Sequence, residues 1–125
     1  MTKRSLNSDT DVTVLVCDDD PTYLLLMEET LSSDNLNVLT AANGADALKL
    51  YLKHEPHIVL LDVHMPMLSG FEVCAEIRKH PRGKDIPILM VTGADDILSI
   101  ENAYKHGATD FLPKPIRWPM VVHRV

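Results

Sequence analysis

Carboxylates follow apolar runs at two places in this chain. Three consecutive aspartates, Asp18, Asp19 and Asp20, come directly after the apolar run at residues 12–17, and Asp62 ends the run that begins at residue 58. Like charges about 4 Å apart repel by up to ~4 kcal/mol at an effective dielectric near 20, so a cluster of them needs a positive partner. Several carboxylate oxygens suit an octahedral Mg²⁺ or Mn²⁺ ion. If the fold brings these residues together, they form a candidate metal site.

Two further polar residues stand where they could act on the same site. Thr92 follows an apolar run, and Lys114 comes just after another. A metal ion, an ammonium and a hydroxyl around one carboxylate are what a phosphoryl group in transfer requires, because its developing charge lies on three equatorial oxygens. Each residue is commonplace taken singly, and Asp20 before Pro21 fits a helix cap. Only the whole set indicates phosphoryl chemistry, with Asp62 as the nucleophile.

The segments between these residues alternate between strand and helix patterns. Strands are predicted at residues 12–17, 38–41, 58–61, 86–91 and 110–112, and helices at 23–31, 45–52, 71–77, 97–104 and, shortened to about two turns, 116–125. Such alternation, with short links, predicts an α/β fold with a doubly wound parallel sheet and helices on both faces. Ligands of such sheets bind at the carboxyl ends of the strands, which is where the polar residues fall.

Length and composition set the class of protein. The chain has 125 residues, 46% of them hydrophobic and 24% charged, which predicts one folded domain over residues 12–125 after a flexible leader at 1–11. A net charge of −6 disfavours direct binding to nucleic acid. No apolar stretch approaches the ~18 residues of a membrane span, so we expect a cytoplasmic protein. Cys17 and Cys74 lack disulfide or zinc spacing, which indicates buried core residues in a reducing compartment.

Four motifs in this order resemble the receiver domain of two-component response regulators. They are VLVCDDDP at residues 14–21, LLDVHMP at 60–66 with Ser69-Gly70 after it, VTG at 91–93 and FLPKP at 111–115. The resemblance spans residue 12 to the end of the chain, and a set of four motifs is far more specific than any one of them. It implies a flavodoxin-like sheet of five strands in the order 2-1-3-4-5, with a truncated fifth helix.

The resemblance also implies a role for each residue of the site. Asp62 would accept a phosphoryl group from a phosphohistidine on a sensor histidine kinase or phosphotransfer protein, and Thr92 and Lys114 would contact the phosphoryl oxygens. Asp19 would bind Mg²⁺ (or Mn²⁺) directly and Asp18 mainly through water. Asp62 and the backbone carbonyl of His64 would complete the protein ligands.

The same resemblance implies a switch and an output. Phe111 would move inward when Thr92 is drawn to the phosphoryl group, although the family often has Tyr there, whose hydroxyl is missing here. His64 stands at a variable place whose side chain modulates hydrolysis of the phosphoryl bond in the family. We favour an exposed loop histidine without a role over a contact between His64 and the phosphate. A homodimer would form through the fourth helix, fifth strand and fifth helix. Residues 114–124 resemble receivers that precede diguanylate cyclase (GGDEF) or related cyclic-di-GMP output domains.

A different function class remains as the alternative. Phosphatases of the haloacid dehalogenase type also place a nucleophilic Asp at a strand end beside Mg²⁺. They use a second Asp two residues later as the general acid, and here that place is His64. We therefore expect a receiver that carries its own phosphorylation and dephosphorylation chemistry but is not an enzyme acting on other substrates.

Overall fold

The computed structural model describes residues 12–32, 36–92, 105 and 107–113. The predicted leader at 1–11 and the predicted helices at 97–104 and 116–125 lie outside the described residues. No helix in the described part of the chain has the length and apolar character needed to cross a membrane.

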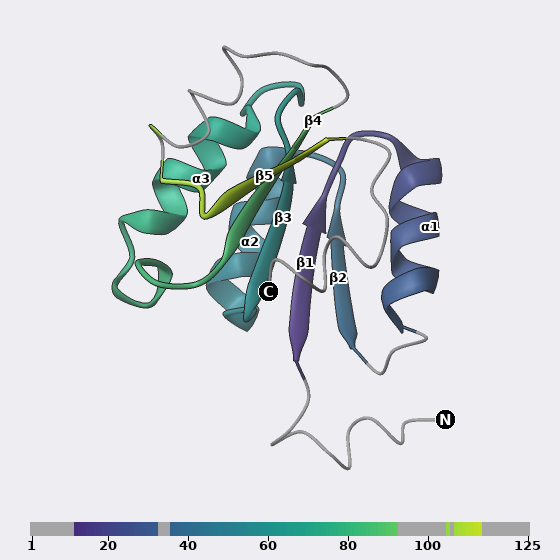
Figure 1. Cartoon of the computed structure of the whole chain (residues 1–125), viewed down its shortest axis with the longest axis horizontal. Helices are drawn as coiled ribbons and strands as arrows, with labels where there is room; N and C mark the ends of the chain where they lie inside the picture. Colours follow the sequence, from purple (N-terminus) through teal and green to yellow (C-terminus); the bar gives the residue numbers. More distant parts are fainter. Residues whose placement is uncertain (1–11, 33–35, 93–104, 106, 114–125) are drawn as a thin grey trace.

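Five parallel strands form one sheet. They are β1 (Thr13–Cys17), β2 (Asn37–Ala41), β3 (Ile58–Asp62), β4 (Ile88–Thr92) and β5 (Asp110–Pro113). The strands lie in the order β2-β1-β3-β4-β5 (Figure 1). The predicted order is confirmed. The order reverses between β1 and β3, and ligands of such sheets bind at the point of reversal.

The fourth strand begins two residues later than predicted. An apolar run from residue 86 predicts a strand there, but β4 begins at Ile88. Pro87 has no N–H to donate to the sheet, and its carbonyl accepts the N–H of Val59 at 3.0 Å. The carbonyl of Ile86 is instead bound by Arg78 at the end of the third helix. Side-chain capture of that carbonyl keeps Ile86 outside the strand.

Helices cover both faces of the sheet. The helix α1 (Pro21–Ser32) packs Met27 and Leu31 on one face, against Leu60 and Leu89. The helices α2 (Gly44–His54) and α3 (Gly70–Arg78) cover the other face (Figure 1). The core on that side includes Leu15, Val59, Leu61, Ala47, Tyr51, Val73, Cys74 and Ile77. Because β1 and β3 are covered on both faces, they are apolar along almost their whole length.

Side chains at the helix starts fix where the chain turns away from the sheet. Asp20 caps α1 as predicted, since its Oδ1 accepts the N–H of Thr22 at 3.0 Å. Asn43 caps α2 through the N–H of Asp46 at 2.8 Å. Ser69 and Glu72 form a reciprocal capping box at α3. The three α-helices in the described part of the chain therefore start at the edge of the sheet where the strands end.

Candidate metal centre at the carboxyl end of the sheet

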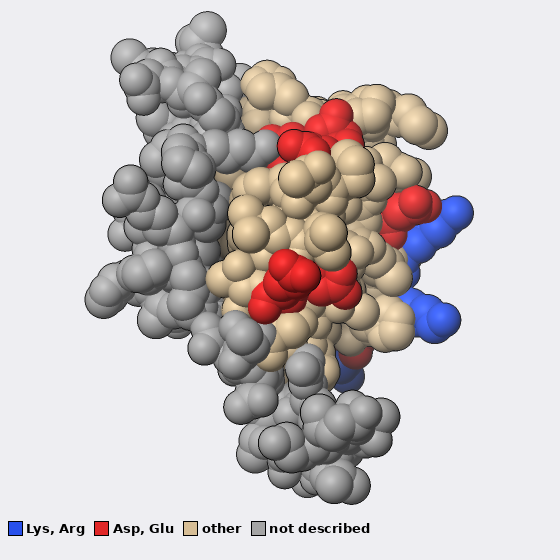
Figure 2. Space-filling view, turned by 90° about the vertical axis from the view of Figure 1, so that its right-hand side faces the viewer, with Lys and Arg blue, Asp and Glu red and all other residues tan. Residues whose placement is uncertain are grey.

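The predicted acidic cluster is present. Cys17 and Leu61 pair in register between the parallel strands β1 and β3, so Asp18 and Asp62 come next to each other at the same edge. One carboxylate oxygen from each of Asp18, Asp19 and Asp62 lies within 4.8 Å of the others. Figure 2 shows acidic side chains at the upper end of the molecule, the edge at which β1 and β3 end in Figure 1.

The three carboxylates differ in exposure. Asp18 is 1% exposed and Asp62 is 6% exposed, whereas Asp19 faces solvent. Asp18 is held by the backbone: its Oδ1 accepts the N–H of Asp20 at 2.9 Å, and its own N–H donates to the carbonyl of Ala41 at 3.1 Å. Two buried carboxylates beside a third charge repel one another, and a cation bound among them would offset this repulsion. Hard oxygen donors of this number fit Mg²⁺ or Mn²⁺.

Sulfur atoms next to the cluster do not change this preference. Cys17 Sγ lies 3.1 Å from Met65 Sδ and donates to the carbonyl of Asn43 at 3.3 Å. Burial, together with the charges of Asp18 and Asp62, raises the pKa of the Cys17 thiol to about 12. Burial and the same two carboxylates raise the pKa of Tyr23 as well. Without an ion both groups are neutral at pH 7, so the charged oxygen donors of the cluster are its carboxylates.

A glycine that the sequence analysis gave no role positions the loop after Asp62. The N–H of Gly70 donates to the carbonyl of Val63 at 3.0 Å, and a Cβ at Gly70 would collide with the carbonyl oxygen of Asp62 and lie 2.8 Å from Met90 Cε. The absence of a side chain therefore lets the start of α3 pack directly on the end of β3. The sequence signal for this close packing is the glycine immediately after Ser69, the residue that caps α3.

We expect Gly70→Ala to destabilise the protein by about 3 kcal/mol, because the backbone of Asp62 must shift to admit the methyl group. Urea denaturation measures this loss. The same shift moves the Asp62 carboxylate away from Asp18 and Asp19, so affinity for Mg²⁺ should also fall. A variant with unchanged unfolding free energy would contradict the close packing.

The remaining predicted site residues lie at this edge, within β5, in the loop after β3 or outside the described chain. Val91 pairs with Asp62 in register, so Thr92, the last residue of β4, follows it at this edge. Phe111 lies in β5 beside Met90 of β4. His64 is exposed in the loop after β3, and Met67 in that loop has a left-handed backbone with a φ of 73°. Lys114 lies outside the described residues.

Comparison with known proteins decides the family. Residues 14–125 match the family described as the response regulator receiver domain. The chain belongs to this family. It is therefore a receiver domain of two-component signalling, as the four motifs predict. Receiver domains in general bind Mg²⁺ in an acidic pocket and interact with histidine kinases or phosphotransfer proteins, and they are not in general enzymes themselves.

Relatives and solved structures agree with the receiver assignment. A probable transcriptional regulator ycf27 of Galdieria sulphuraria is 40% identical over 82% of this chain and 39% of its own length. The response regulator PleD of Caulobacter vibrioides is 37% identical over 90% of this chain and 25% of its own. A putative response regulator from Chloroflexus aurantiacus has 35% identity and a TM-score of 0.86, covering 92% of this chain and 94% of its own. This receiver domain spans about two-fifths or less of these two curated relatives.

Proposed function

We propose that Asp62 accepts a phosphoryl group from a phosphohistidine and becomes an aspartyl phosphate. The observation that carries the proposal is the meeting of Asp18, Asp19 and Asp62 within 4.8 Å at the carboxyl end of the sheet. Asp62 is the strand-end carboxylate of β3, and only 6% of its surface is exposed. A nucleophile in this place is shielded from bulk water but open at the rim to a donor.

The transfer needs no proton from Asp62. A carboxylate oxygen attacks the phosphorus, an O–P bond forms, and the P–N bond breaks with its electron pair staying on the imidazole nitrogen of the donor. The donor is a sensor histidine kinase or a phosphotransfer protein. Little covalent chemistry is left for the protein, so positioning and charge stabilisation carry the rate.

Asp18, Asp19, Asp62 and the backbone carbonyl of His64 would hold Mg²⁺ or Mn²⁺. When bound, the ion neutralises negative charge on the phosphoryl oxygens. The burial of Asp18 and its hydrogen bond from the Asp20 N–H keep its carboxylate in place before any ion arrives. Asp19, which is exposed, can reach an ion from the solvent side.

Thr92 and Lys114 complete the proposed site, with Thr92 bonding one phosphoryl oxygen and Lys114 pairing with another. Attraction of Thr92 toward the phosphoryl group would move Phe111, whose strand β5 pairs with β4. We propose that this movement changes the surface formed by the last helix and strand. The changed surface would pair two copies of the chain and switch an output domain. A cyclic-di-GMP output and a cytoplasmic location stay predictions.

Beryllofluoride, a phosphoryl mimic, tests the proposal. With Mg²⁺ present, ¹⁵N–¹H spectra should show saturable shifts at Asp62, in the loop after it and in β4 and β5, and no such shifts should occur without Mg²⁺. Asp62→Asn is the control and should show none in either condition. Equal shifts in the Asn variant would contradict Asp62 as acceptor, and steady turnover of small phosphate esters would favour the phosphatase alternative.

A further inference from the structure

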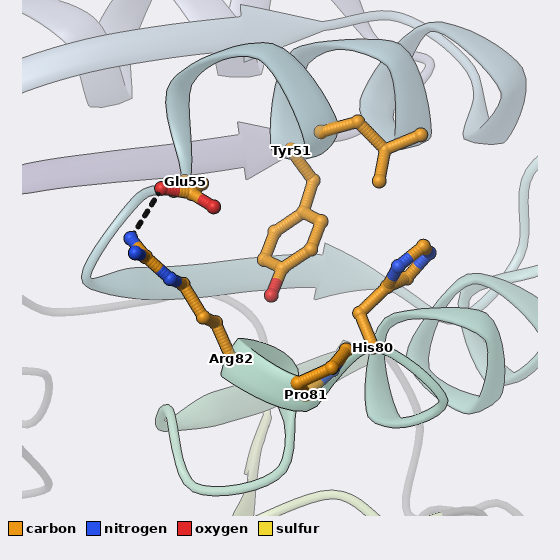
Figure 3. A pocket seen from close by; sticks show the side chains of 6 residues that line it. Tyr51, Glu55, His80, Pro81 and Arg82 are labelled. Carbon is orange, nitrogen blue, oxygen red and sulfur yellow. Dashed lines mark hydrogen bonds and ion pairs between the residues drawn. The ribbon is translucent and has the colours of Figure 1, made fainter.

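A hollow lies at the end of the sheet opposite the acidic cluster, where α2 ends. It has a volume of about 250 Å³ and is lined by Tyr51, Leu52, Glu55, His80, Pro81 and Arg82 (Figure 3). A neighbouring hollow of about 330 Å³ shares Tyr51, Glu55 and Arg82. Because α2 starts beside the Asp62 loop and runs back along the sheet, this pocket is separate from the acidic cluster.

Tyr51 supplies a polar group at the floor of the pocket. The residue is 3% exposed, and its hydroxyl points from α2 into the space between Arg82 and Pro81 (Figure 3). Gly83 allows this approach, since a Cβ there would lie 2.8 Å from the Tyr51 hydroxyl. Burial and the charge of Glu55 raise the pKa of Tyr51, so the hydroxyl keeps its proton and can donate it. No hydrogen bond joins this hydroxyl to another residue within the described ranges.

Arg82 supplies a cation that a ligand can reach. Its Nη1 lies 2.7 Å from Glu55 Oε1, and the two side chains are 77% and 50% exposed. Exposed ion pairs of this kind stabilise by at most about 1 kcal/mol, so an incoming anion can displace Glu55 at little cost. Arg82 therefore already binds one oxyanion, the Glu55 carboxylate, at the wall of the pocket.

The surroundings favour an anion over a cation. Lys53 stands at the end of α2, and Lys84 follows the 3₁₀ turn η2 (Pro81–Gly83). Cations are common at the C-terminal ends of α-helices because they offset the helix dipole. This reason does not apply to Arg82, because it lies in the short turn η2. Arg78 is committed elsewhere, with hydrogen bonds to the carbonyls of Gly83, Ile86 and Gly107.

We propose that this pocket binds a small organic anion, with its carboxylate or phosphate on Arg82 and the Tyr51 hydroxyl and its apolar body against Leu52 and Pro81. The tilted Tyr51 and His80 rings, 6.1 Å apart, form the inner wall for a flat group. This binding site is separate from Asp62. It does not depend on the phosphoacceptor role proposed above.

Benzoate is the probe, because it combines one carboxylate with a flat apolar ring. Titration of the full chain, followed by ¹⁵N–¹H spectra, should give saturable shifts at Leu52, Glu55, Arg82 and Gly83 with a dissociation constant on the order of millimolar. Benzamide has the same shape without the charge and should bind at least about tenfold more weakly. Equal binding of the two would overturn the role of the anion.

Three variants locate the site. Arg82→Gln should weaken benzoate at least about tenfold, and Glu55→Gln should strengthen it about threefold by freeing Arg82. Lys79→Gln removes the same charge from an exposed side chain that pairs with Glu76 outside the pocket, and should change affinity less than about twofold. Both Arg82 and Glu55 are at least half exposed, so the fold survives their replacement. Loss of binding in Lys79→Gln equal to that in Arg82→Gln, or absence of saturation, would refute the proposal.

Discussion

Replacing Asp62 with asparagine is expected to reduce acid-labile labelling by a small phosphodonor such as acetyl phosphate about 10³-fold or more. The amide oxygen of asparagine is a poor nucleophile. The replacement also removes one of the three negative charges at the site. The measurement is incorporation of radioactive phosphate in the presence of Mg²⁺, with the base lability of an acyl phosphate as a check on the linkage.

The Asp62 variant keeps the volume of the side chain, so a loss of label reports on chemistry. Circular dichroism and urea denaturation should show a fold at least as stable as the original, since a buried charge near Asp18 has been removed. A matched control is Asp46→Asn on α2, which changes the same charge outside the cluster. Label retained in Asp62→Asn would count against the acceptor role.

Replacing Asp19 with asparagine is expected to weaken Mg²⁺ binding about 10- to 100-fold. Asp19 is the exposed member of the cluster, so its removal leaves the buried framework of Asp18 and Asp62 in place. Without metal, the same change should raise the free energy of unfolding by about 1 kcal/mol, because two carboxylates lose a repelling neighbour. Opposite effects on metal affinity and on stability without metal distinguish a ligand from a merely structural residue.

Asp20→Asn is the control for Asp19→Asn. Asp20 is the next residue and carries the same charge, but its carboxylate caps α1 by accepting the Thr22 N–H and is not in the cluster. Asparagine caps helices as well as aspartate does, so Mg²⁺ affinity should change less than about threefold. Isothermal titration with Mg²⁺ measures both variants, and equal losses would contradict the assignment of Asp19 as a ligand.

The order of the strands and the acidic edge were predictable from the sequence. Apolar runs buried on both faces, such as the one ending at Cys17, alternate with helical patterns. Short right-handed connections leave few ways to arrange them. Because parallel strands end at one edge, Asp18 and Asp62 had to meet there even though 44 residues separate their numbers. The resemblance to receiver domains assigned the chemistry, and the family match agrees with it.

Tertiary packing alone decided the contacts that depend on how closely the helices approach the sheet. The clash of a Gly70 side chain with the Asp62 carbonyl, and the meeting of Cys17 with Met65, come from the fit of α3 and its loop against β1 and β3. Likewise the pocket between Tyr51 and Arg82 forms where α2 meets η2, a turn with no periodicity in the sequence. Sequence patterns report which face of an element is apolar. The distance between two packed elements is set by the shapes of all the side chains between them.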